Sequence, residues 1–235
     1  MAQSVDRIRH FLRTSEFHLV VTLGSEMIVR AQTDSHFREV VRSSALVVPD
    51  SMGTLWASRY CGYRLKERVT GVELVQVLAQ QLGPELRLFL LGGAPGVAER
   101  AAERLLRLAP GVTIAGLRDG FFQSDQDVVE QIRHSGANLV LAGMGFPRQE
   151  NWLALHGPQT GAQVGIGVGG TLDVLAGKVQ RAPVWMQRAG LEWLYRFAKQ
   201  PTRWQRMLAL PKFALRVITG GKEAVKPLPP AGRVA

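Results

Sequence analysis

The sequence of 235 residues contains one cysteine, Cys61, so it cannot form a disulfide within a single chain. Its five histidines form neither an HExxH motif nor a Cys/His pairing, and no zinc site is predicted. No apolar run approaches the roughly eighteen residues of a membrane span, and the N-terminus lacks the basic-then-apolar order of a signal peptide. We therefore expect a cytoplasmic protein without a zinc site, and no cofactor is expected.

Negative charge is scarce toward the C-terminus. The whole chain has a net charge of +10, yet from Arg181 onward eleven Lys and Arg face only two acids, Glu192 and Glu223. The first 180 residues are therefore almost neutral, at +1. This asymmetry predicts an anionic partner for the C-terminal part alone.

The remaining sequence alternates short, β-rich apolar runs with helical patterns. A hydrophobic fraction of 46% supports a folded core. The alternation predicts an α/β fold: a Rossmann-like, mainly parallel sheet flanked by helices. Long helices are expected at 27–44 and 71–83. The expected strands lie within 17–24, 45–50, the first part of 86–111, 112–120, 137–147 and 162–170.

Three segments follow from these patterns. Residues 1–183 are predicted to form the α/β catalytic body, and 184–222 a basic, amphipathic helical appendage. Residues 223–235 are expected to be a flexible tail. Aromatic residues and arginines interleave in the appendage, which suits nucleic acid, a membrane surface, or simple packing on the body.

Ligands of parallel α/β sheets bind outside the carboxyl ends of the strands. Four such ends carry distinctive residues: the turn at Asp50, and the segments 90–96, 143–150 and 167–173. Asp50 could cap the helix that follows it or serve as a catalytic base. The glycines at 90–96 fit a phosphate loop or a plain tight turn about equally well.

Two further motifs each have a structural and a functional interpretation. Asp125 and Asp127 form a D-x-D sequence that could hold a metal, but Ser124 as a helix cap explains both acids and is favoured. Gln149, just past a buried strand, could hold hydroxyl groups or a uracil ring, or could begin a solvated helix; both readings stay open.

Several long motifs, taken in their order along the chain, resemble the WecG/TagA/CpsF glycosyltransferase family over nearly the whole chain. The motifs are VVPDSMGTLWASRY, LFLLGGAPGVAER, GMGFPRQENW, GKVQRAP and LEWLYRFAKQPTRWQRM. The resemblance implies a bacterial enzyme that moves a sugar, N-acetylmannosamine or its uronic acid, from a UDP-sugar to a polyprenyl-diphosphate-linked sugar. It also implies inversion, no required metal, and peripheral attachment to the inner face of the cytoplasmic membrane.

The resemblance assigns roles to individual residues. Asp50 matches the proposed general base. Thr22, Arg68 and Gln149 match residues of the donor and acceptor pocket. From the glycine loops and the Gln149 segment we also expect ligand contacts by Gly92, Gly93, Glu150, Gly169 and Gly170. The arginines expected to bind the lipid diphosphate are Arg196, Arg203 and Arg206.

Two positions depart from the family pattern. Gly24 stands where the family usually has Asn, and Ser51 follows Asp50 where glycine is usual. The missing amide leaves open a UDP-glucose-type donor, or a family member that binds nucleotide sugars without catalysis. A nucleotide-binding or nucleic-acid-associated protein on the same sheet is the competing class, although no nucleic-acid partner is expected. A homo-oligomer remains open.

Overall fold

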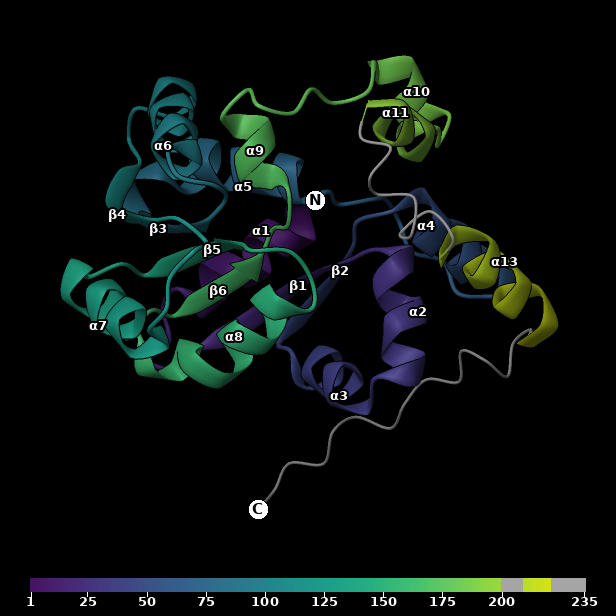
Figure 1. Ribbon diagram of the computed structural model, residues 1–235, viewed down its shortest axis with the longest axis horizontal. Helices are drawn as coiled ribbons and strands as arrows, with labels where there is room; N and C mark the ends of the chain where they lie inside the picture. Colours follow the sequence, from purple (N-terminus) through teal and green to yellow (C-terminus); the bar gives the residue numbers. More distant parts are fainter. Residues whose placement is uncertain (200–208, 221–235) are drawn as a thin grey trace. The chain divides into compact units, whose positions relative to one another are not determined.

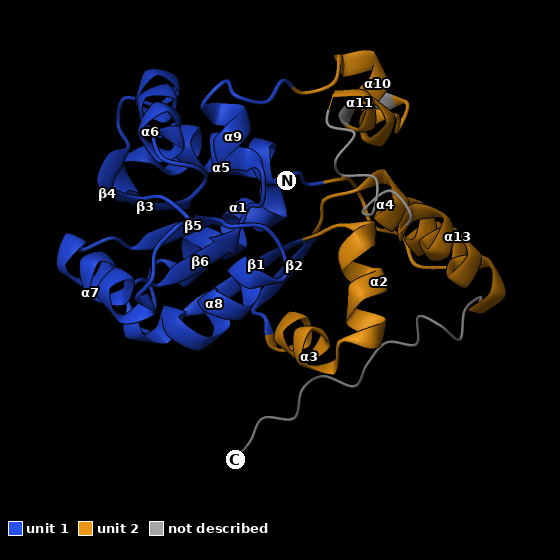
Figure 2. Ribbon diagram, viewed as in Figure 1, with its two compact units in different colours: residues 1–22, 44–48, 69–180 blue, residues 23–43, 49–68, 181–235 orange. Residues whose placement is uncertain are grey.

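The computed structural model describes residues 1–199 and 209–220, which fall into two compact units (Figure 2). Unit 1 consists of Met1–Thr22, Ser44–Val48 and Val69–Gln180. Unit 2 takes in Leu23–Ser43, Pro49–Arg68 and the chain from Arg181 onward. The predicted tail at 223–235 lies outside the described residues, and the predicted boundary at 183 stays a prediction.

Unit 1 is built on a six-stranded sheet with the order β2-β1-β6-β5-β3-β4 (Figure 1). The pairs β1–β6, β6–β5, β5–β3 and β3–β4 are parallel. All six strands coincide with the predicted ones, which confirms the α/β, Rossmann-like fold. The strands are β1 (His18–Leu23), β2 (Leu46–Pro49), β3 (Arg87–Gly92), β4 (Thr113–Arg118), β5 (Leu139–Gly143) and β6 (Val164–Gly167).

Helices cover both faces of this sheet, as expected for a parallel sheet. Alternate strand residues such as Leu88 and Leu90 share one core with helices on the first face, whereas Phe89 points to the other face. On the other face α7 and α8 contact β4, β5 and β6 (Figure 1). The helices of the first face are α1 (Ala2–Phe11), α5 (Gly71–Leu82), α6 (Val97–Leu108) and α9 (Thr171–Leu175); those of the other are α7 (Asp125–Ser135) and α8 (Arg148–His156).

Unit 2 is helical. Its small core joins Ala57 and Cys61 of α4 and the turn after it to Phe213 and Val217 of α13, with Ile28 of α2 packed against them. From residue 184 onward the described residues form three helices, as predicted, and α13 contributes to this core. The helices are α2 (Ser25–Thr33), α3 (Ser35–Ser43), α4 (Met52–Tyr60), α10 (Val184–Arg188), α11 (Glu192–Lys199) and α13 (Ala209–Gly220).

The prediction of a single helix over 27–44 is wrong, because the chain forms two helices that meet at Asp34. Asp34 has an extended backbone, with φ −112° and ψ 97°. Its carboxylate accepts the N–H of Phe37 at 2.9 Å, which is how an acidic side chain caps the start of a helix. This hydrogen bond, followed by the contribution of Arg30, lowers the pKa of Asp34. Capping by Asp34 thus outweighed the continuous helical pattern.

The sequence predicts attachment to a membrane surface but no segment that crosses the membrane. Among residues 1–199 and 209–220, no helix combines the length and the apolar character needed to cross a bilayer.

Candidate active site

Asp50 follows β2 directly, and Ser51 rather than Asp50 caps the next helix. The hydroxyl of Ser51 accepts the N–H of Thr54 at 3.1 Å, at the start of α4. The backbone N–H of Asp50 donates to Leu23 O at 3.0 Å and so holds this turn beside the end of β1. Of the two readings that the sequence left open for Asp50, the helix cap is therefore excluded.

Ser51, one of the two departures from the family pattern, is the centre of a hydroxyl network. Its Oγ lies 2.7 Å from Ser25 Oγ and 2.8 Å from Thr54 Oγ1, and accepts the N–H of Ser25 at 3.2 Å. These bonds join the first turns of α2 and α4. A glycine here could not make them, so this chain fixes the backbone around Asp50 with a side chain of its own.

A cavity of about 200 Å³ opens beside Asp50, and all the residues that line it belong to unit 2. Its wall is formed by the starts of α2 and α4, by Arg68 and by the segment that leads into α11. Complete small-molecule pockets usually measure at least about 300 Å³. This cavity can therefore hold part of a larger ligand, such as one sugar ring and a neighbouring phosphate.

Arg68 and Glu192 form an ion pair in the wall of this cavity. Arg68 Nη1 lies 3.1 Å from Glu192 Oε2, and the side chains are only 14% and 12% exposed. Limited contact with water makes such a pair stronger than one on the open surface. The sequence predicted Arg68 but missed Glu192, since nothing local relates residues 124 positions apart.

Thr22 and Gln149 belong to a second group, in unit 1. Gln149 is 2% exposed, and its Oε1 accepts the N–H groups of Gly145 at 3.1 Å and Gly169 at 3.0 Å. It thereby ties together the loops after β5 and β6. Thr22 is also buried, and its hydroxyl donates to Gly167 O at 2.7 Å. The geometry supports a positioning function for both side chains, while the direct ligand contact implied by the resemblance stays a prediction.

Glu150 is fully buried next to Gln149. Its Oε1 accepts a hydrogen bond of 2.7 Å from Gln149 Nε2, and Oε2 has no partner in the described parts of the chain. Burial raises the pKa of Glu150 to about 7, more than the Gln149 hydrogen bond lowers it. Its carboxyl group therefore changes protonation near neutral pH.

The four glycines that were predicted to contact ligand occupy different structural environments. Gly92 has φ +135°, and a Cβ there would come within 2.5 Å of the Gly143 backbone. The N–H of Gly93 donates to Gly143 O at 3.2 Å, so strand packing accounts for both residues. At Gly169 and Gly170, by contrast, a Cβ would meet no heavy atom of the described residues within 4 Å. Open space makes Gly169 and Gly170 the better candidates for ligand contact, which stays a prediction for all four.

The acidic D-x-D motif is a helix start, as favoured. Ser124 caps α7 and accepts the N–H of Asp127 at 3.1 Å. Asp125 accepts the indole N–H of Trp152 at 2.7 Å. Within the described ranges, no three His, Cys, Asp or Glu residues are grouped so that they could hold a metal ion.

Of the three arginines expected to bind the lipid diphosphate, only Arg196 falls within the described residues. It lies in α11, the helix whose first turn carries Glu192. Arg203 and Arg206 lie outside the described ranges. Their predicted role stays a prediction.

Comparison with known proteins decides the family. The family described as "Glycosyl transferase WecG/TagA/CpsF family" matches residues 1–226. The chain belongs to this family. It is thus a glycosyltransferase, and the resemblance inferred from its motifs is confirmed.

Individual relatives of this glycosyltransferase cover most of its length. A Bacillus subtilis (strain 168) protein is 33% identical over 211 residues, which span 89% of this chain and 82% of the relative. A Staphylococcus aureus (strain MW2) protein is 29% identical over 229 residues, spanning 96% of this chain and 90% of the relative. Both relatives are named N-acetylglucosaminyldiphosphoundecaprenol N-acetyl-beta-D-mannosaminyltransferase.

Proposed function

We propose that this glycosyltransferase moves an N-acetylmannosamine-like sugar from a UDP-sugar to a sugar carried on a polyprenyl diphosphate, for cell-surface polysaccharide or teichoic acid synthesis. The names of the relatives support the acceptor, because those enzymes act on N-acetylglucosamine linked to diphosphoundecaprenol. The acceptor's polyprenyl chain resides in a bilayer, so the enzyme works at the inner face of the cytoplasmic membrane.

The observation that carries the proposal is the position of Asp50 in the wall of the same cavity as Arg68. A carboxylate and a guanidinium are the two groups that a direct displacement needs, one to accept a proton and the other to balance the charge of the leaving diphosphate. Asp50 accepts the proton of the acceptor hydroxyl while the hydroxyl oxygen attacks the anomeric carbon of the donor sugar. The bond from that carbon to the UDP oxygen breaks, UDP leaves as an anion, and the single displacement inverts the configuration.

In this mechanism arginines supply the positive charge, and no metal is required. Arg68 lines the cavity and is held in place by its ion pair with Glu192. Guanidinium groups bind phosphate oxygens in paired hydrogen bonds, which suits a diphosphate. Arg196, Arg203 and Arg206, the arginines that the family resemblance indicates, bind the acceptor diphosphate.

A second donor class is favoured by Gly24. This residue lines the cavity, has ordinary backbone angles of φ −91° and ψ 163°, and has room for a Cβ, whose closest contact would be 3.9 Å away. Its backbone therefore does not require glycine, and the cavity wall simply lacks the amide that is usual in the family. A donor without the N-acetyl group, such as a UDP-glucose-type sugar, fits this difference.

A transfer assay across a panel of UDP-sugars, with a short-chain lipid-diphosphate N-acetylglucosamine acceptor, tests the proposal. Transfer from UDP-N-acetylmannosamine supports the main proposal, whereas faster transfer from UDP-glucose supports the second. A protein that only binds nucleotide sugars would show a higher melting temperature with UDP but no transfer with any donor. If duplex DNA and not UDP raised the melting temperature, the transferase proposal would be overturned.

A further inference from the structure

The end of α4 and the loop after it expose an unusual density of aromatic side chains. Trp56 and Tyr60 are 40% and 48% exposed, and Tyr63 and Leu65 follow within five residues, also exposed. We call seven exposed residues of this segment the α4 surface: Trp56, Arg59, Tyr60, Tyr63, Arg64, Leu65 and Lys66; Gly62 and Glu67 are exposed beside them. In unit 1, by contrast, large exposed apolar residues such as Phe121 and Leu155 are scattered over separate elements, which is normal for a soluble surface.

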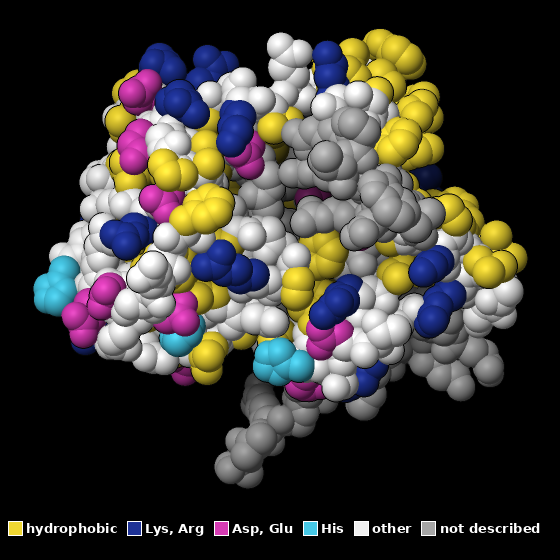
Figure 3. Space-filling model, viewed as in Figure 1, with side chains coloured by type: hydrophobic (Ala, Val, Ile, Leu, Met, Phe, Trp, Pro, Cys, Tyr) yellow, Lys and Arg dark blue, Asp and Glu magenta, His cyan; other side chains and the backbone are white. Residues whose placement is uncertain are grey.

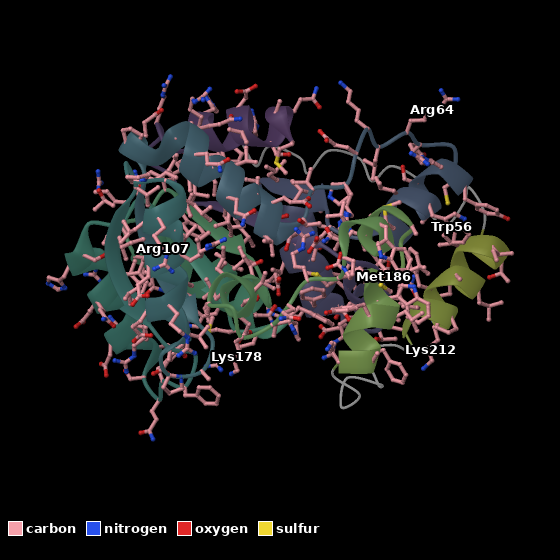
Figure 4. The ribbon with its side chains drawn as sticks, turned by 90° about the horizontal axis from the view of Figure 1, so that it is seen from above. Trp56, Arg64, Arg107, Lys178, Met186 and Lys212 are labelled. Atoms are coloured by element: carbon pink, nitrogen blue, oxygen red, sulfur yellow. The ribbon has the colours of Figure 1, made fainter. Side chains whose placement is uncertain are left out.

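The α4 surface is also cationic. Arg59, Arg64 and Lys66 are exposed and alternate with the aromatic residues, whereas Glu67 is the one acid among residues 56–67. Figure 4 shows Arg64 standing clear of the ribbon beside α4, and Trp56 near α13. Aromatic rings interleaved with basic side chains are typical of surfaces that lie at the phosphate level of a bilayer.

The loop is held in a defined shape with these side chains outward. Ser58 Oγ donates to Tyr63 O at 2.6 Å and accepts the N–H of Leu65 at 3.2 Å. At the other end the ring of Trp56 lies 5.7 Å from that of Tyr60 and 6.4 Å from that of Phe213. Fixed hydrogen bonds therefore support an exposed apolar surface that the loop could otherwise bury by collapsing.

We propose that the α4 surface docks on an anionic lipid bilayer and thereby places the catalytic cavity at the level of the lipid phosphates. Three exposed cations against one acid complement a negatively charged leaflet. The chain runs from Lys66 to Arg68, in the cavity wall, with one residue between them. Contact at the α4 surface thus brings Arg68 to the depth at which a diphosphate on a lipid lies.

This inference rests on the proposed function, which requires a lipid-linked acceptor. It identifies a second membrane-contact region, separate from the basic appendage. Exposed apolar side chains also gather over α10, α11 and the outer part of α13 in unit 2 (Figure 3). Those helices belong to the appendage, whereas the α4 surface belongs to the segment between Asp50 and Arg68. The part of the chain that carries the catalytic residues is itself a membrane-contact region.

Vesicle sedimentation with the full chain tests the proposal without substrate. Vesicles of phosphatidylglycerol and phosphatidylcholine are compared with pure phosphatidylcholine vesicles. The variant Arg59→Gln/Arg64→Gln/Lys66→Gln should bind the anionic vesicles roughly 100-fold more weakly, because each basic residue near such a surface contributes about five-fold. Tyr63→Ser/Leu65→Ser should weaken binding while leaving the net charge unchanged.

The matched control is Arg100→Gln/Arg104→Gln/Arg107→Gln, which removes the same charge from the exposed face of α6. Its binding should stay within a few-fold of the wild type, and the melting temperatures of all variants should match. Equal loss in the α6 control, unchanged binding in the α4 variants, or equally tight binding to neutral vesicles would overturn the proposal. If the protein bound vesicles in this way but transferred no sugar, the docking proposal would be supported and the proposed function would be refuted.

Discussion

Arg68 and Glu192 meet in the wall of the cavity that contains Asp50, with 3.1 Å between Nη1 and Oε2. The pair connects the segment after α4 to the first turn of α11. It holds the guanidinium in one direction, and it also occupies part of the hydrogen-bonding capacity that a diphosphate would use. The same contact therefore affects both the stability of unit 2 and its affinity for ligand.

Exchanging the two charges should separate these effects. Arg68→Glu and Glu192→Arg alone each place like charges together in a largely buried site, and should cost about 3–5 kcal/mol. For a chain of this size this is a fall in melting temperature of about 2–4 °C per kcal/mol. The double variant should recover much of the stability but not the turnover, because the cation then projects from α11. Full recovery of turnover would show that the position of the cation is unimportant.

Removing the proton acceptor should slow catalysis strongly and leave nucleotide binding unchanged. Asp50→Asn keeps the size of the side chain but removes the base, so we expect turnover to fall by about 10²- to 10⁴-fold. The rise in melting temperature caused by UDP should persist. Asp6→Asn, on the exposed side of α1, is the matched control. Wild-type turnover in the Asp50 variant would exclude it as the base.

The raised pKa of Glu150 predicts that the free energy of unfolding depends on pH. Its pKa of about 7 in the folded protein lies above the ordinary value of 4.5, so the folded state retains its proton where the unfolded state has lost it. The contribution is fully present below about pH 4.5 and is lost as the pH rises through 7, on the order of 3 kcal/mol in all. Glu150→Gln should therefore match the wild type near pH 4 and be more stable at pH 8.

Urea unfolding at the two pH values measures this difference. Glu99→Gln, on the exposed first turn of α6, serves as the control and should change stability little at either pH. If Glu150→Gln and the wild type had the same pH profile, the raised pKa would be wrong.

Restoring the amide at residue 24 tests the donor. Gly24 is the N-cap of α2, where Asn is tolerated and is slightly stabilising, so Gly24→Asn should fold normally. If this position reads the N-acetyl group, kcat/KM for UDP-N-acetylmannosamine relative to UDP-glucose should rise by about tenfold, or about 1.4 kcal/mol. Gly24→Ala fills the space without an amide and should leave the ratio unchanged. An equal change in both variants would trace the effect to volume alone.

The sequence alone determined the order of the elements and the local chemistry at their ends. Six strands, the Ser124 cap and the acid after β2 could be predicted because periodicity, turn residues and capping groups act within a few positions. The break at Asp34 obeys the same local rules, because its carboxylate caps an N–H only three residues away.

Tertiary structure decided which residues meet. Ser51 meets Ser25 of α2, Glu192 is the partner of Arg68, and Gln149 links two glycine loops. These relationships depend on how helices and loops pack after the chain has folded, across separations of up to 124 residues. Local propensity carries no information about such contacts, because the free energy that selects them comes from burial and hydrogen bonding between distant segments.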